Sequence, residues 1–153
     1  MPWTPPATPP RRFLIVLVLV TTLAYGVVAG AAAPAAAAGD RSRMLTLING
    51  TRRQHGERRL QLSLSVSRMA TAHSRRMAKL HKLFHTANLG GKLKNWSVYG
   101  ENVAYGWGVH QVFKAWMNSA EHRRNILNRK FKHVGIGLYW KGGTLWATAD
   151  FWG

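Results

Sequence analysis

Hydrophobic residues recur at helical spacing in the stretch 43–55, which predicts the first helix of the chain. Met44, Leu47 and Ile48 share one face of this helix, and arginines occupy the opposite face. Gly56 follows directly, and glycine often ends a helix because it adopts the left-handed conformation without steric cost. The pattern therefore predicts a helix that is capped by Gly56.

A clearer amphipathic stripe follows and predicts a second helix, with Ser63 or Ser65 as its N-cap. The residues of the stripe recur every three or four positions: Val66, Met69, Ala70, His73, Met77 and Leu80. A third helix is expected over 109–118, and a further turn or short helix over 119–127.

The C-terminal residues alternate between apolar and polar, which predicts a β-hairpin. A Lys-Gly-Gly-Thr turn at 141–144 joins its two strands. Glycine and asparagine residues over 86–97 predict a loop, and 98–105 has the pattern of a short strand. Because helices and antiparallel strands occur in separate runs, the chain is expected to have an α+β fold.

Residues 1–38 differ from the rest and are typical of an export signal. Arg11 and Arg12 precede an apolar run that begins at Phe13 and ends in alanine-rich sequence near Ala38. The run 13–38 is also long enough to act as a membrane anchor, so both interpretations stay open. We therefore expect a signal peptide or anchor at 1–38, a folded domain at 39–153, and a secreted or membrane-anchored protein.

Charge narrows the set of expected partners. The 153 residues contain 22 lysines and arginines against 5 acidic residues, a formal net charge of +17. A field of this sign concentrates polyanions, so an anionic cell-surface polymer or an anionic lipid is an expected partner. No nucleic-acid-binding motif occurs, and nucleic acid is therefore expected to bind only non-specifically. A surface that only provides solubility is the alternative.

Cysteine is absent. Without a thiol, the chain cannot form a disulfide framework, a thiolate zinc site or a cysteine nucleophile. Packing alone must stabilise the fold.

Several segments in a fixed order resemble the CAP superfamily of cysteine-rich secretory proteins, antigen 5 and pathogenesis-related proteins. The likeness runs from Leu45 to Phe151, and the lack of cysteine is similar to the bacterial, disulfide-free branch. Its most specific part is the triplet Gly-Glu-Asn at 100–102, followed by Trp-Met-Asn-Ser at 116–119 and His-Arg at 122–123. Further parts are Leu47-Ile48-Asn49, Ala72-His73-Ser74, Phe84-His85-Thr86, Asn125-Ile126-Leu127 and Val134-Gly135-Ile136-Gly137.

The resemblance implies an αβα sandwich, in which helices cover a central antiparallel sheet. It also implies a cleft with two histidines and two glutamates. The histidines correspond to His85 and His122, and one glutamate corresponds to Glu101. The second glutamate has no counterpart, because Ser119 stands at its position.

Three interpretations of these residues remain open. His85, His122 and Glu101 could bind zinc or another divalent metal, or Glu101 could instead orient one histidine. Ser119 could act as a nucleophile with His122 and Glu101, although no nucleophile elbow surrounds it. The two histidines and Glu101 could also form a buried polar network that performs no chemistry, and Ser119 could have only a capping or packing role.

The expected function is therefore that of a secreted module whose cleft binds a divalent metal or a small apolar ligand at the cell envelope. One alternative is a metal-assisted hydrolase of protein or cell-wall substrates, with Glu101 as the base and His85 and His122 as ligands or acid. Another is an exported polyanion-binding protein. The sequence leaves open whether the protein is an enzyme.

Overall fold

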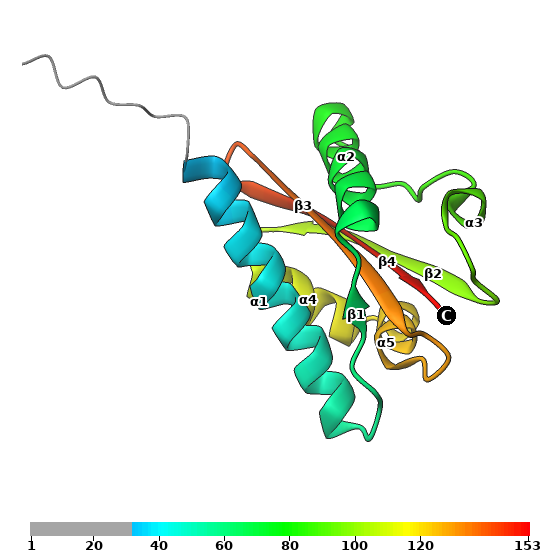
Figure 1. Cartoon of the computed structure of the whole chain (residues 1–153). Coiled ribbons are helices and arrows are strands. Elements are labelled where there is room, and N and C mark those ends of the chain that lie inside the picture. Colours follow the sequence, from blue (N-terminus) through cyan, green and yellow to red (C-terminus); the bar gives the residue numbers. More distant parts are fainter. Residues whose placement is uncertain (1–31) are drawn as a thin grey trace, which may run out of the picture.

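The computed structural model describes residues 32–153, which form five helices and four strands (Figure 1). They are α1 (Ala32–Gln54), β1 (Gln61–Leu62), α2 (Leu64–Leu80), α3 (Leu89–Lys92), β2 (Tyr99–Gly106), α4 (Val109–Asn118), α5 (Ala120–Leu127), β3 (His133–Lys141) and β4 (Thr144–Trp152). Most of the expected signal or anchor lies outside the described residues, and its boundary after residue 38 falls within α1. In the described part of the chain, no helix is both long and apolar enough to cross a bilayer.

The four strands form one sheet in the order β1-β3-β4-β2. The hairpin β3–β4 and the pair β2–β4 are antiparallel, as expected. The short β1 pairs in parallel with β3 through two residues, which makes the sheet mixed.

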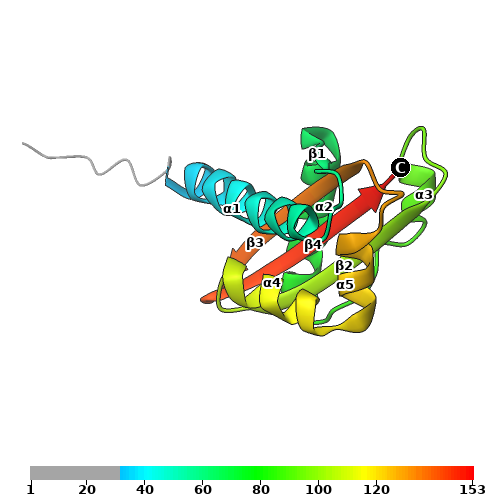
Figure 2. The same cartoon turned by 90° about the horizontal axis from the view of Figure 1, so that it is seen from below.

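Helices cover both faces of this sheet (Figure 1, Figure 2), which confirms the αβα sandwich. The side chains of β4 alternate between the two faces of the sheet. Its odd-numbered residues from Leu145 to Phe151 join the main core with α1, α4 and α5. The even-numbered Trp146 and Trp152 pack in two smaller clusters with residues of α2 and α3.

Glycines allow α2 to lie very close to β3. A Cβ atom added to Gly137 would be 2.0 Å from the carbonyl carbon of Ala70 in α2, a distance that real Cβ atoms do not reach. The close approach places the Ser67 hydroxyl 3.0 Å from the backbone N–H of Ile136, which donates to it. β1 pairs with β3 through two residues only. At Ile136 the Ser67 hydroxyl therefore provides the hydrogen-bond acceptor that a longer neighbouring strand would provide.

Most local predictions are confirmed. Gly56 has a φ of 75° after α1, and the Ser63 side chain accepts a hydrogen bond from the backbone of Val66 at the start of α2. The continuous loop expected over 86–97 is wrong, because α3 lies within it. The Asn88 side chain caps α3, and Leu89 is buried beside Trp152. Tertiary burial thus stabilises a helix whose two glycines disfavour it locally.

Candidate functional site

The centre of the candidate site is a contact between His85 and Glu101. His85 lies in the connection between α2 and α3, and its side chain is 66% exposed, whereas the Glu101 side chain in β2 is 5% exposed. The Nδ1 atom of His85 is 2.8 Å from the Oε1 atom of Glu101. A buried carboxylate that binds Nδ1 fixes the orientation of the ring and leaves Nε2 available.

Thr86 holds the Glu101 carboxylate from the same connection. The backbone N–H of Thr86 donates to Oε1 of Glu101 at 2.8 Å. Burial by itself raises the pKa of Glu101, but hydrogen bonding by Thr86 and His85 outweighs this effect and lowers the pKa below its ordinary value. Glu101 is therefore ionised at neutral pH and is a strong acceptor for an imidazole N–H.

A second carboxyl group, Asp150, lies directly opposite Glu101 in the β2–β4 register. Asp150 is fully buried, and neither of its side-chain oxygens has a hydrogen-bond partner among the described residues. Burial raises its pKa to about 8, and the negative charge of Glu101 adds to this shift. At neutral pH the pair therefore carries one negative charge and retains one proton.

Asp150 is not among the site residues predicted from the sequence. A usable signal was present, because the residue is one of 5 acidic residues in the chain and interrupts a strand of apolar and aromatic residues. Aspartate is depleted in strands, and a buried carboxyl without a cationic partner is uncommon. What the sequence could not provide was the register that pairs position 150 with position 101.

His122 lies in α5, which contacts the edge strand β2. Its backbone carbonyl accepts a hydrogen bond from the Nδ2 atom of Asn102, at a distance of 3.0 Å. Burial lowers the pKa of His122, and the charge that His85 can carry lowers it further. His122 is therefore neutral at neutral pH.

Ser119 lies outside both helices that flank it. It ends α4 and begins α5 in an extended conformation, with φ −91° and ψ 124°, and its side chain makes no capping hydrogen bond. Ser119 is thus the N-cap residue of the helix that contains His122. The nucleophile role of Ser119 stays a prediction.

The metal-site prediction involves three residues, of which the structure joins two in direct contact. Within residues 32–153, no three His, Cys, Asp or Glu side chains are placed to hold a metal ion together. Because Oε1 of Glu101 is engaged by His85 and Thr86, the structure favours Glu101 as the residue that orients His85.

Neither of two hollows in the described part of the chain is lined by these three residues. One, of about 610 Å³, has a strongly basic lining. The other, of about 370 Å³, is formed by Val66, Met69 and Trp152 with two lysines and two serines. Binding of a small apolar ligand stays a prediction.

Sequence comparison identifies relatives of the whole folded region. The model of the CAP family, described as the cysteine-rich secretory protein family, matches residues 45–151. The uncharacterised protein YkwD of Bacillus subtilis is 34% identical in an alignment of 113 positions that covers 68% of this chain and 44% of that protein. The chain thus spans less than half the length of this relative.

Structure comparison agrees. An extracellular protein of Bacillus anthracis that contains an SCP domain has a TM-score of 0.66 and 26% identity over 75% of this chain and 40% of that chain. An outer surface protein of Borrelia burgdorferi has a TM-score of 0.65 at 15% identity, over 74% of this chain and 92% of that chain. The second likeness shows a shared fold.

Proposed function

Because the chain belongs to the CAP family of cysteine-rich secretory proteins, we propose that it acts outside the cytoplasm as a module that binds a divalent cation. His85 and His122 would hold the cation, and Glu101 would orient His85. The contact between His85 and the buried Glu101 carboxylate carries this proposal. The apolar segment after Arg12 and the extracellular relative from Bacillus anthracis support export.

The chemistry of these groups fits a divalent cation such as zinc. Imidazole binds a metal only in its neutral form, and the lowered pKa of His122 keeps that ring neutral at neutral pH. The Nδ1 atom of His85 is engaged by Glu101, so its Nε2 atom is the one that faces outward as a ligand. A hydrolytic activity of the same residues stays a prediction.

Zinc titration by calorimetry tests the cation site. We expect one zinc ion to bind, and we expect His85→Ala or His122→Ala to weaken its affinity at least about 10-fold. Glu101→Gln should weaken it by a factor of about 10 to 100, because the neutral amide no longer fixes the charge and tautomer of His85. His110→Ala is the control, since His110 is exposed on α4.

Circular dichroism of each variant separates loss of the ligand from loss of the fold. Zinc affinity that is unchanged in the folded double variant His85→Ala/His122→Ala would contradict the proposal. An equal loss in His110→Ala would do the same.

A second function is favoured by the excess of 22 lysines and arginines over 5 acidic residues. We propose that this charge lets the domain bind a polyanion at the cell envelope. The proposal uses the surface of the domain and is independent of the cation site.

A further inference from the structure

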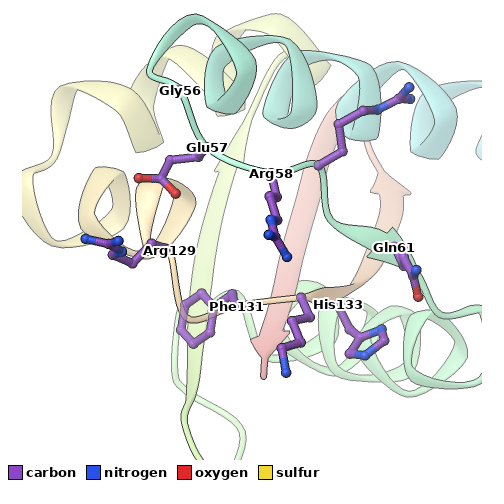
Figure 3. A pocket seen from close by; sticks show the side chains of 9 residues that line it. Gly56, Glu57, Arg58, Gln61, Arg129, Phe131 and His133 are labelled. Atoms are coloured by element: carbon purple, nitrogen blue, oxygen red, sulfur yellow. The ribbon is translucent and has the colours of Figure 1, made fainter.

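The hollow of about 610 Å³ lies between two connections, one that joins α1 to β1 and one that joins α5 to β3. We call it the basic hollow, and Figure 3 shows it from close by. The residues that carry its charge or form its base are Glu57, Arg58, Arg59, Arg129, Phe131 and Lys132. In the view, Arg58 extends from the first connection toward the second, and Arg129 lies at one side near Glu57.

The charges around this hollow are not balanced. Four lysine and arginine side chains line it, but Glu57 is the one carboxylate in its lining. The ion pairs among the described residues are Arg43 with Asp40 and His85 with Glu101, so none of the four cations forms an ion pair, and they outnumber the single carboxylate of Glu57. A concave surface with unpaired cations attracts anions more strongly than a flat one, because its low-dielectric walls focus the field.

A buried arginine holds the two walls of the hollow together. Arg52 is 0% exposed, and its Nε atom donates to the carbonyl of Arg58 at 2.7 Å. Its Nη1 atom donates to the carbonyl of Ile126 at the end of α5, at 2.8 Å, and to that of Asn128 at the start of the other connection, at 2.9 Å. One guanidinium group thus fixes the backbone from which the lining cations extend.

The strand pairing reinforces this frame. The backbone N–H of Gln61 donates to the carbonyl of Lys132 at 2.9 Å, and the N–H of Lys132 donates to the carbonyl of Trp152 at 2.9 Å. Phe131, which is 2% exposed, stacks on Phe151 beneath the hollow. Because the walls are already fixed, a ligand loses little affinity to the ordering of backbone.

We propose that the basic hollow is the binding site for a phosphate-bearing polymer, an inference that rests on the polyanion binding proposed above. Guanidinium groups match phosphate oxygens in a two-point geometry, and here arginines stand on both walls. The volume is within the range of about 300 to 1,000 Å³ that is usual for sites enclosing a ligand much larger than one phosphate ion. Several phosphates of one chain can therefore occupy it together.

Shape and position favour a polymer over a bilayer surface. The lining cations stand around a concavity, which a flat membrane cannot enter but a linear chain can. The hollow also begins at Gly56, just after α1, whose 23 residues place its two ends about 34 Å apart. The predicted export or anchor segment ends at residue 38, near the opposite end of this helix. The part of α1 that follows it, 39–54, is about 24 Å long, so a membrane held there would lie away from the hollow.

Fluorescence polarisation with a labelled linear polyphosphate tests the inference. The double variant Arg58→Gln/Lys132→Gln removes one arginine and one lysine from the hollow. The control Arg75→Gln/Lys79→Gln removes the same charges from the exposed side of α2. At equal ionic strength we expect the first variant to lose at least about 10-fold in affinity and the second less than about 2-fold, because only the first pair contacts phosphates directly.

Each further outcome is decisive. Equal losses of polyphosphate affinity in the two variants would show that the net charge of the domain binds the polymer. This result would contradict a specific site at the basic hollow but would leave the proposed polyanion binding intact. A wild-type protein that binds neither polyphosphate nor phosphatidylglycerol vesicles would overturn the polyanion function as well. Binding to phosphatidylglycerol vesicles without binding to polyphosphate would show that the ligand is a membrane surface and not a polymer. Equally tight binding to polyglutamate would exclude specific recognition of phosphate.

Discussion

Replacing Gly137 by alanine is expected to destabilise the protein by at least about 3 kcal/mol, the upper end of the usual cost of overpacking. The added methyl group would lie 2.0 Å from the carbonyl carbon of Ala70 and 2.1 Å from the backbone nitrogen of Thr71. These are backbone atoms of α2, so no side-chain rotation relieves the clash. The helix must move away from β3.

That movement would also break two hydrogen bonds between α2 and β3. The Ser74 hydroxyl donates to the carbonyl of Gly137 at 3.0 Å, and the Ser67 hydroxyl accepts from Ile136. Urea unfolding measures the effect. Gly50→Ala is the matched control, because a Cβ atom at Gly50 meets nothing within 4 Å in α1. It should leave stability unchanged or raise it by up to about 1 kcal/mol. A Gly137→Ala protein as stable as the control would disprove the close packing.

Asp150→Asn is expected to remove a strong pH dependence of stability. The pKa of Asp150 is raised from 3.8 to about 8 by burial and by the charge of Glu101. Between these values the folded protein holds a proton that the unfolded chain has released, so stability falls as pH rises. The slope for one proton is about 1.4 kcal/mol per pH unit. Asparagine keeps the size and the neutral state of the protonated acid but does not titrate.

Urea unfolding of both proteins between about pH 5 and pH 8, with a chelator present, isolates this contribution. His122 has a lowered pKa and contributes stability that is lost as pH falls, but it does so in both proteins and cancels in the difference. The free energy of unfolding of the variant should increase steadily relative to that of the wild type as pH rises. Parallel stability curves across this range would show that Asp150 is ionised in the folded state.

Local signals in the sequence accounted for most of the fold. A serine cap, a glycine after the first helix, three-and-four spacing in α2 and alternation in the hairpin each act within a few residues, and each was confirmed. His73 shows the same logic, because its place in an apolar stripe indicated a buried residue. It is 2% exposed, and its Nε2 atom lies 2.7 Å from the carbonyl oxygen of Phe84.

Long-range features could not be predicted in this way. The resemblance to a family placed His85 and Glu101 in one cleft, but it did not show that Thr86 shares the same carboxylate oxygen. The pairing of Asp150 with Glu101 depends on strand register, and α3 depends on burial beside Trp152. The Arg52 contacts that frame the basic hollow join residues more than 70 positions apart. Such contacts are tertiary and leave no periodic trace in the sequence.

The central claim is that His85 and His122 share one ligand while Glu101 orients His85. Nitrogen NMR of the imidazole rings during a zinc titration tests it most directly. We predict that resonances of both rings shift together and saturate at one equivalent of zinc, with the proton of His85 held on Nδ1 by Glu101. A shift confined to one of the two rings, or to other histidines, would contradict the claim.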